Sequence, residues 1–219
     1  MSPTFDERLV FFDIETAGFF DIVAGQVEVT RPIIQIAAIA IDRDDRDCET
    51  FEVKVQFDEA DADPGTLCKN HYDGDIWSRH ALPPTVAAAR FAAFLRRHAT
   101  VDRLSRSGKP YRLAQLVAHN AERFDGPLIH AWFRQLDRFC PATYSVYCTK
   151  QRAYWLFQEH KQLTPPPDFQ LTTLCQYFAV PLREEEWHDA INDVWATVEL
   201  YRAMRQFERD AVRNVPSVA

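Results

Sequence analysis

Glycine is scarce in this chain, and long apolar runs are absent. Only 6 of its 219 residues are glycine, whereas 16 are phenylalanine and 47% are hydrophobic, which argues against disorder and for a packed globule. No apolar stretch reaches the 18 residues expected of a membrane-spanning helix, and the chain does not start with the basic-then-apolar pattern of a signal peptide. We therefore expect a soluble cytoplasmic protein without membrane association.

Cysteine pairs and excess positive charge are absent as well. The five cysteines include no CxxC pair, and Cys68-x-x-His71 has no matching second pair, so neither a disulfide framework nor a structural zinc site is expected. The net charge of −7 argues against a protein that grips nucleic acid by bulk positive charge. An acidic, cation-binding site remains compatible with this charge, because bound ions reverse the local sign.

The pattern of apolar residues predicts an α/β fold. We expect strands over 8–15, 33–41, 49–57, 113–118 and 144–148. We expect helices that begin after 83–84 and near Asp125, then over 149–160 and 171–178, and from Ala190 onward. Segment 58–82 is expected to be irregular and 100–112 to be a basic loop. This order predicts a mixed sheet flanked by helices in a single domain over residues 1–219.

The first acidic motif, FFDIETAG, lies at the end of the first predicted strand. Asp13 and Glu15 are two residues apart, so their side chains leave the same face of the strand, while Phe12 and Ile14 turn to the other. Two adjacent carboxylates repel each other unless a cation lies between them. Taken alone, such a pair more often marks the end of a strand than a metal site.

The second motif, AHNAERFD, ends in Asp125 at the predicted start of a helix. An acid is favoured there by the exposed backbone N–H groups and the helix dipole. Pro127 supports a helix that begins close by, since proline is accepted in the first turn. A capping residue and a metal ligand are both compatible with this position.

The third motif, HDAINDVWAT, spans the start of the last predicted helix. Asp189 is a natural N-cap for a helix from Ala190, which leaves His188 just outside and Asp193 in the first turn. A histidine beside a metal site, with an ordinary pKa near 6.5, is the expected general base at neutral pH. A lone His-Asp pair would instead be a surface ion pair.

Together, the three motifs resemble those of the DnaQ-like 3′–5′ exonuclease superfamily, in its DEDDh branch. The similarity extends over about residues 8–205. The histidine five residues before Asp193 distinguishes this branch from the tyrosine-bearing one, and the second motif has a spacing closest to TREX-type members. Ala17 and Gln35 stand where many members carry threonine and glutamate. The resemblance implies an RNase H-like fold, with a five-stranded mixed sheet whose first three strands are antiparallel.

The resemblance also implies two Mg²⁺ or Mn²⁺ ions and the release of 5′-mononucleotides from a 3′ end. Asp13 would bridge both ions, and Glu15 and Asp193 would help to hold the ion that binds the attacking water. Asp125 would act near the second ion, and His188 would take the proton from the nucleophile. Such a metal pair clamps an in-line displacement at phosphorus.

Six residues are predicted to contact the substrate or line its site: Thr16, Ala17, Phe19, Phe20, His119 and Asn120. The backbone around Thr16 and Ala17 would face the terminal nucleotide. One of the two phenylalanines would stack on bases and the other would be core. His119 and Asn120 would contact phosphate or fix their loop. The basic loop over 103–112 would guide the strand or simply be solvated.

Substrate and partners stay open at this point. We favour single-stranded DNA, with an exoribonuclease as the alternative. The choice between DNA and RNA stays open because no reader of the 2′-OH can be identified from the sequence. A non-catalytic relative that binds nucleic acid or a partner usually lacks one of the acids, and all five positions are intact here. An HD-type phosphohydrolase built on His188-Asp189 would leave Asp13 and Glu15 unexplained. The sequence supports no polymerase or clamp association, and it leaves a homodimer open.

Overall fold

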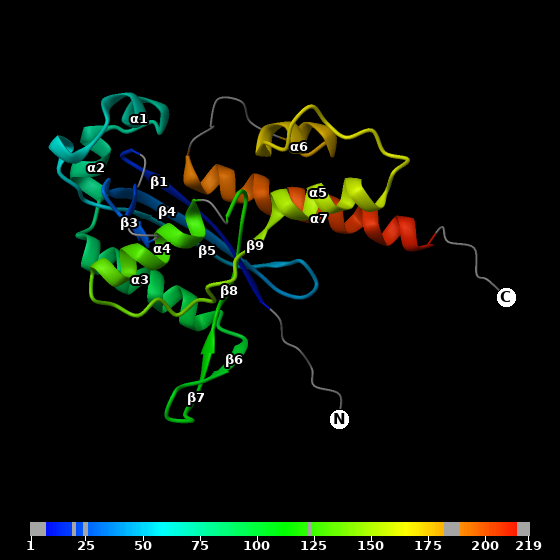
Figure 1. Cartoon of the computed structure of the whole chain (residues 1–219). Helices are drawn as coiled ribbons and strands as arrows, with labels where there is room; N and C mark the ends of the chain where they lie inside the picture. Colours follow the sequence, from blue (N-terminus) through cyan, green and yellow to red (C-terminus); the bar gives the residue numbers. More distant parts are fainter. Residues whose placement is uncertain (1–7, 19–20, 24–25, 122–123, 182–188, 214–219) are drawn as a thin grey trace.

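A five-stranded sheet forms the centre of the molecule (Figure 1). The computed structural model describes residues 8–18, 21–23, 26–121, 124–181 and 189–213. The sheet has the order β5-β4-β1-β8-β9 and consists of β1 (Leu9–Thr16), β4 (Ile33–Ile41), β5 (Asp47–Lys54), β8 (Gln115–Ala118) and β9 (Tyr147–Cys148). β1, β4 and β5 are antiparallel, whereas β8 and β9 run parallel to β1. The predicted RNase H-like mixed sheet is therefore confirmed.

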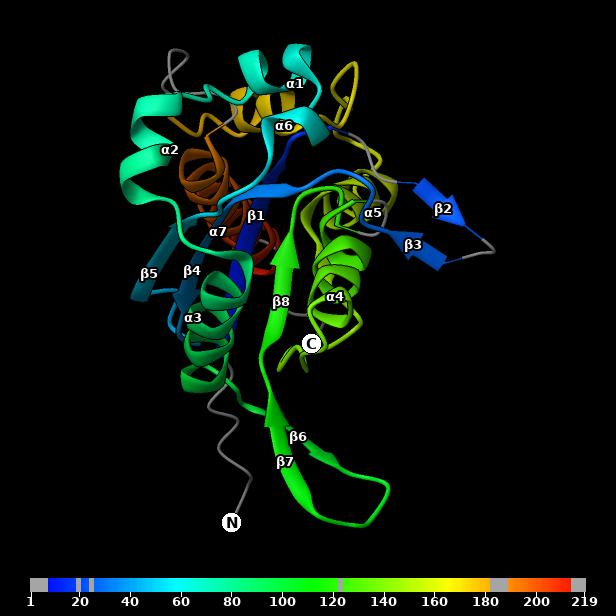
Figure 2. The same cartoon turned by 90° about the vertical axis from the view of Figure 1, so that its left-hand side faces the viewer.

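Two helices cover one face of this sheet (Figure 2). They are α3 (Pro84–Arg97) and α4 (Asp125–Gln135), and their apolar sides share one core cluster with Phe12 and Ile14 of β1. All nine residues of β4 are buried, as expected for a strand that is covered on both faces.

The opposite face is covered by the long C-terminal helix α7 (Ala190–Arg213). Its residues Val194 and Val198 share a second cluster with Phe11 of β1. Behind it, α5 (Thr149–Glu159) and α6 (Leu171–Tyr177) pack against α7 in a third cluster. None of the helices in the described ranges has the length and apolar content needed to cross a bilayer.

Segment 58–82, predicted to be irregular, is largely helical. It contains η1 (Glu59–Asp61), α1 (Pro64–Lys69) and α2 (Gly74–His80). Asp63 and Asp73 cap the two α-helices by accepting hydrogen bonds from backbone N–H groups of the first turn. The prediction was wrong because these helices are too short to show a period, and they are held by their caps and by the burial of Trp77.

Segment 100–112, predicted to be a loop, is a hairpin of β6 (Val101–Leu104) and β7 (Pro110–Leu113). Its turn closes with a hydrogen bond from the Gly108 N–H to the Ser105 carbonyl, and Gly108 has a φ of 75°, a conformation that suits glycine. The hairpin leads into the start of β8, which pairs with the start of β1. The hairpin itself projects away from the sheet (Figure 2). Its basic side chains therefore lie at the opposite end of β1 from the first acidic motif. A second hairpin, β2 (Asp21–Val23) and β3 (Gln26–Glu28), occupies the long link after β1.

Candidate active site

Asp13 and Glu15 lie on the face of β1 that α7 covers. Strand alternation places them on the same side as Phe11, which packs against α7, while Phe12 and Ile14 are buried on the other side. The predicted orientation of the two acids is thus confirmed. Asp13 is half-buried, and Glu15 is only 9% exposed.

Helix α7 brings the third motif to the same place. Asp189 caps it: the Asp189 Oδ1 accepts a hydrogen bond of 3.4 Å from the Ile191 N–H, and its carbonyl accepts one of 3.1 Å from the Asp193 N–H. The helix therefore begins at Ala190, as the sequence predicts, with Asp193 in its first turn.

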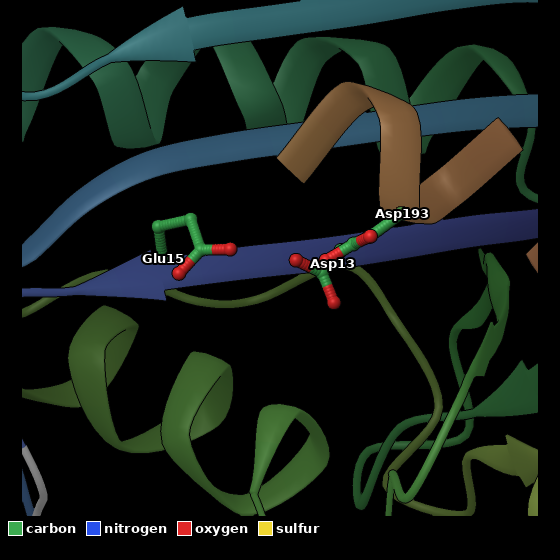
Figure 3. A group of neighbouring side chains, drawn as sticks. All are labelled: Asp13, Glu15 and Asp193. Atoms are coloured by element: carbon green, nitrogen blue, oxygen red, sulfur yellow. The ribbon is translucent and has the colours of Figure 1, made fainter. Parts of the chain in front are cut away.

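Three carboxylates converge where β1 meets α7. One oxygen from each of Asp13, Glu15 and Asp193 lies within 4.8 Å of the others, and Figure 3 shows the three side chains pointing toward one another. Such a group of oxygen donors is of the kind that hard divalent cations prefer. The three acids thus fit a divalent cation such as Mg²⁺ or Mn²⁺.

Asp125 is the first residue of α4 and is only 3% exposed. The N-cap is Phe124, which makes no capping bond through its side chain, so Asp125 is not the cap. Its carboxylate accepts backbone hydrogen bonds from Ile14 of β1 and from its own N–H, and it is close enough to Asp13 to raise the pKa of that residue. The structure therefore brings the fourth predicted acid beside the other three.

The electrostatics of this cluster are unfavourable for free carboxylates. Burial, followed by repulsion from Asp125, Glu15 and Asp193, raises the pKa of Asp13 well above its ordinary value. Burial and then repulsion from Asp193 and Asp125 raise the pKa of Glu15 to about 9. Burial raises the pKa of Asp125 to about 7, although its backbone hydrogen bonds oppose the rise. A bound cation would remove this cost of ionisation.

Three predicted site residues, His188, Phe19 and Phe20, lie outside the described residues. His188 immediately precedes Asp189, the cap of α7, in the sequence. The roles of all three stay predictions.

The backbone at Thr16 and Ala17 is bonded within the protein. The Thr16 carbonyl accepts a hydrogen bond of 2.9 Å from the Asn70 side-chain amide. The Ala17 N–H donates to the Pro32 carbonyl at 2.8 Å, and the Ala17 carbonyl accepts from the Asp63 N–H at 2.7 Å. These bonds fix the end of the first motif, and the predicted contact with a nucleotide stays a prediction.

His119 is held by both of its ring nitrogens. Nδ1 lies 2.9 Å from the Thr149 hydroxyl and Nε2 lies 3.0 Å from the Phe169 carbonyl. Burial lowers the pKa of His119 to about 4, so the ring is neutral at pH 7. This geometry suits a residue that fixes its loop. Asn120 adopts a left-handed conformation with φ 59°, which asparagine tolerates better than most residues.

Asn70 was missed by the sequence analysis. It is the C-cap of α1 and only 7% exposed. Besides its bond to Thr16, its side chain makes a hydrogen bond that opposes the rise in the pKa of Glu15. One signal in the sequence could have indicated the helix that ends at Asn70. The Asp63-Pro64 pair is typical of a helix start, and it lies in the segment that was predicted to be irregular.

The sheet topology and the carboxylate cluster define the class: an RNase H-like fold with an acidic site whose residues fit a divalent cation. No family model matches the chain. It is 26% identical over 206 residues to ribonuclease T of Actinobacillus pleuropneumoniae, covering 89% of this chain and 82% of that protein.

Two solved structures of exonuclease I are similar in fold. The one of E. coli exonuclease I in complex with a 5cy-dT13 oligonucleotide has a TM-score of 0.71 at 16% identity, over 94% of this chain and 42% of that one. Another has a TM-score of 0.68 at 17% identity, over 91% of this chain and 41% of that one.

This chain therefore spans about two fifths of the exonuclease I chains that it matches. The predicted resemblance to the DnaQ-like exonucleases is confirmed, and the proteins that the chain matches bear the names of nucleases, in agreement with the predicted enzyme class. The closer likeness of the second motif to TREX-type members stays a prediction.

Proposed function

We propose that this chain is a metal-dependent 3′–5′ exonuclease that releases 5′-mononucleotides from single-stranded DNA. The observation that carries the proposal is the convergence of Asp13, Glu15 and Asp193, with one oxygen from each within 4.8 Å of the others. Asp125 lies beside them at the start of α4. Metal-assisted phosphodiester hydrolysis uses a bound cation and a positioned base, and the three motifs supply candidate side chains for both.

The chain's own residues hold and orient the reaction. Asp13, Glu15 and Asp193 would hold the ion on the side of the attacking water, and Asp125 would serve a second ion on the leaving-group side. When bound, Mg²⁺ or Mn²⁺ supplies charge neutralisation at the phosphate and a more acidic water. His188 would accept the proton of that water, which is favourable because a free imidazole has a pKa near neutrality.

DNA is the proposed substrate because the matched structure of E. coli exonuclease I contains a thymidine oligonucleotide. A second candidate is a 3′–5′ exoribonuclease, which the sequence similarity to ribonuclease T favours. Both candidates use the same carboxylates and differ only in the polymer that enters the site.

The test uses 5′-labelled single-stranded DNA and RNA of one sequence, incubated with Mg²⁺, Mn²⁺ or EDTA. Asp13→Ala serves as the inactive variant, and Asp44→Asn, which changes an exposed acid in the β4–β5 turn, serves as the matched control. We expect a ladder that shortens from the 3′ end with metal and is absent with EDTA and with Asp13→Ala. The faster ladder identifies the polymer. Intact DNA and RNA in every lane would contradict the proposal and favour a non-catalytic binding role.

A further inference from the structure

Gln35 is a buried amide beside the acidic cluster. It lies on β4 directly opposite Glu15 in the antiparallel register and is only 2% exposed. Directly opposite residues of an antiparallel pair project to the same face of the sheet. The Gln35 side chain thus shares with Glu15 the face that α7 covers.

The Gln35 amide connects two carboxylates from distant parts of the chain. Its Nε2 donates a hydrogen bond of 2.8 Å to Oδ1 of Asp189, the cap of α7, and another of 3.1 Å to Oε1 of Glu52 on β5. The same Glu52 oxygen lies 2.7 Å from Nζ of Lys54. A side-chain amide has two hydrogens and can serve both acceptors at once.

A glutamate at this position could not make both of these bonds, because even when protonated it would have a single hydrogen for two acceptors. Ionised, it would have no hydrogen to donate and would face Asp189 and Glu52 with a third negative charge, next to Glu15. By bonding to both carboxylates at once, the amide offsets the repulsion between Asp189 at the start of α7 and Glu52 of β5. Because Asp193 lies in the first turn of α7, the position of this helix start determines where Asp193 meets Asp13 and Glu15.

We propose that Gln35 is a positioning residue that holds the start of α7, and with it Asp193, against the acids of β1. This inference rests on the proposed exonuclease function, because it assigns Gln35 to the geometry of that site. Gln35 does not itself touch substrate or ion in this role. It acts through Asp189 and the helix that Asp189 caps.

The test compares Gln35→Glu and Gln35→Met with Gln115→Glu and Gln115→Met. Gln115 is a matched control because it is also a buried strand amide, 8% exposed, with two donated hydrogen bonds, to the carbonyls of Leu116 and Ser145. It lies at the other end of the sheet, opposite Leu9. A lost hydrogen bond to a charged group corresponds to a change of about 10–100-fold. We expect kcat to fall by about this factor in both Gln35 variants, with KM for DNA nearly unchanged and the Gln115 variants near wild type per folded molecule.

A charge exchange tests the contact itself. In the double variant Gln35→Glu with Asp189→Asn, the new amide can donate to the new carboxylate, and asparagine remains a good N-cap. We expect the exchange to restore about tenfold of the kcat lost in Gln35→Glu alone. Wild-type kcat in Gln35→Glu, an equal loss in Gln115→Glu, or no recovery in the double variant would overturn the proposal.

A second readout separates this inference from the proposed function. Hydrogen exchange of the first-turn amides of α7 should be at least about tenfold faster in Gln35→Met than in wild type, and unchanged in Gln115→Met. If wild type cleaves no nucleic acid while this exchange difference is present, the proposed function fails and the positioning of α7 stands. If wild type cleaves and the exchange difference is absent, the positioning role is overturned.

Discussion

Replacing Glu15 by glutamine should stabilise the metal-free protein while abolishing its activity. Glu15 is 9% exposed and lies among carboxylates, and burial followed by repulsion from Asp193 and Asp125 raises its pKa from 4.5 to about 9. Glutamine has nearly the same shape and carries no charge. It can still accept a hydrogen bond from Asn70, so the substitution removes the charge and little else.

The size of the effect follows from the pKa of Glu15. A rise from 4.5 to about 9 corresponds to ~6 kcal/mol, at 1.36 kcal/mol per pKa unit. The expected gain is smaller than this value for two reasons. Repulsion among the other acids persists in the variant, and the wild-type protein can reduce its own cost by protonating Glu15 or by admitting water to the site. We therefore expect a gain in the free energy of unfolding of about 1–3 kcal/mol at pH 8. For a domain of this size that is about 3–10 °C in Tm.

The assay is thermal unfolding in EDTA at pH 5 and pH 8, with Asp44→Asn as the control for loss of an exposed acid. Because the folded-state pKa of Glu15 is raised, the folded protein binds more protons than the unfolded chain, and its stability falls as pH rises from about 4.5 toward 9. The advantage of Glu15→Gln should thus be large at pH 8 and small at pH 5. Added Mg²⁺ should raise the Tm of wild type more than that of the variant. An EDTA-treated variant that melts at or below wild type at pH 8 would refute the reasoning.

Three further predictions concern residues in the motifs or directly after them. His188→Ala should lower kcat by roughly 10²–10⁴-fold in initial-rate measurements at neutral pH, the usual effect of a positioned base, and full activity would mean that another group is the base. Phe19→Ala or Phe20→Ala should raise KM for DNA while leaving Mn²⁺ affinity unchanged in calorimetric titrations, because stacking on bases involves no metal ligand; a parallel loss of Mn²⁺ binding would indicate a folding defect instead. Gly126→Ala should lower Tm and activity together, because its Cβ would lie 2.8 Å from the Ala121 carbonyl oxygen, and such overpacking costs about 1–3 kcal/mol. An unchanged melting curve would show that the backbone yields without cost.

The parts of the fold that sequence predicted are those with long, regular apolar patterns. The strand over 33–41 and the helix from Ala190 were both predicted with their observed starts. A nearly continuous apolar run indicates a buried strand, and a capped amphipathic stripe indicates a helix. The helices within 58–82 and the hairpin within 100–112 were missed. Each is short and mostly exposed, and depends on caps, a turn or a distant contact rather than on its own periodicity.

In the candidate site, too, local sequence patterns predicted some features, whereas those that depend on distant contacts were missed. Asp13 and Glu15 were assigned to one face of a strand, and Asp193 to the first turn of a helix, from local spacing alone. That these segments meet is a property of the tertiary fold, and the motif order predicted it only through the resemblance to a family. Asn70 could not be found in this way, because it reaches Thr16 across 54 residues of sequence, and nothing in its local sequence shows that contact.

The amides around the cluster explain how so acidic a site can fold. Repulsion from neighbouring acids already raises the cost of ionising Asp13, Glu15 and Asp125, so an additional acid in contact with them would raise it further. Two neighbours among the described residues are neutral donors: Asn70 bonds to Thr16 and Glu15, and Gln35 bonds to Asp189. Neutral donors fix the acids in place and stabilise their charged forms without competing for the cation. The cluster is therefore positioned before metal arrives and is stabilised when metal binds, so the tightest metal binding and the largest metal-induced rise in Tm should both occur above neutral pH.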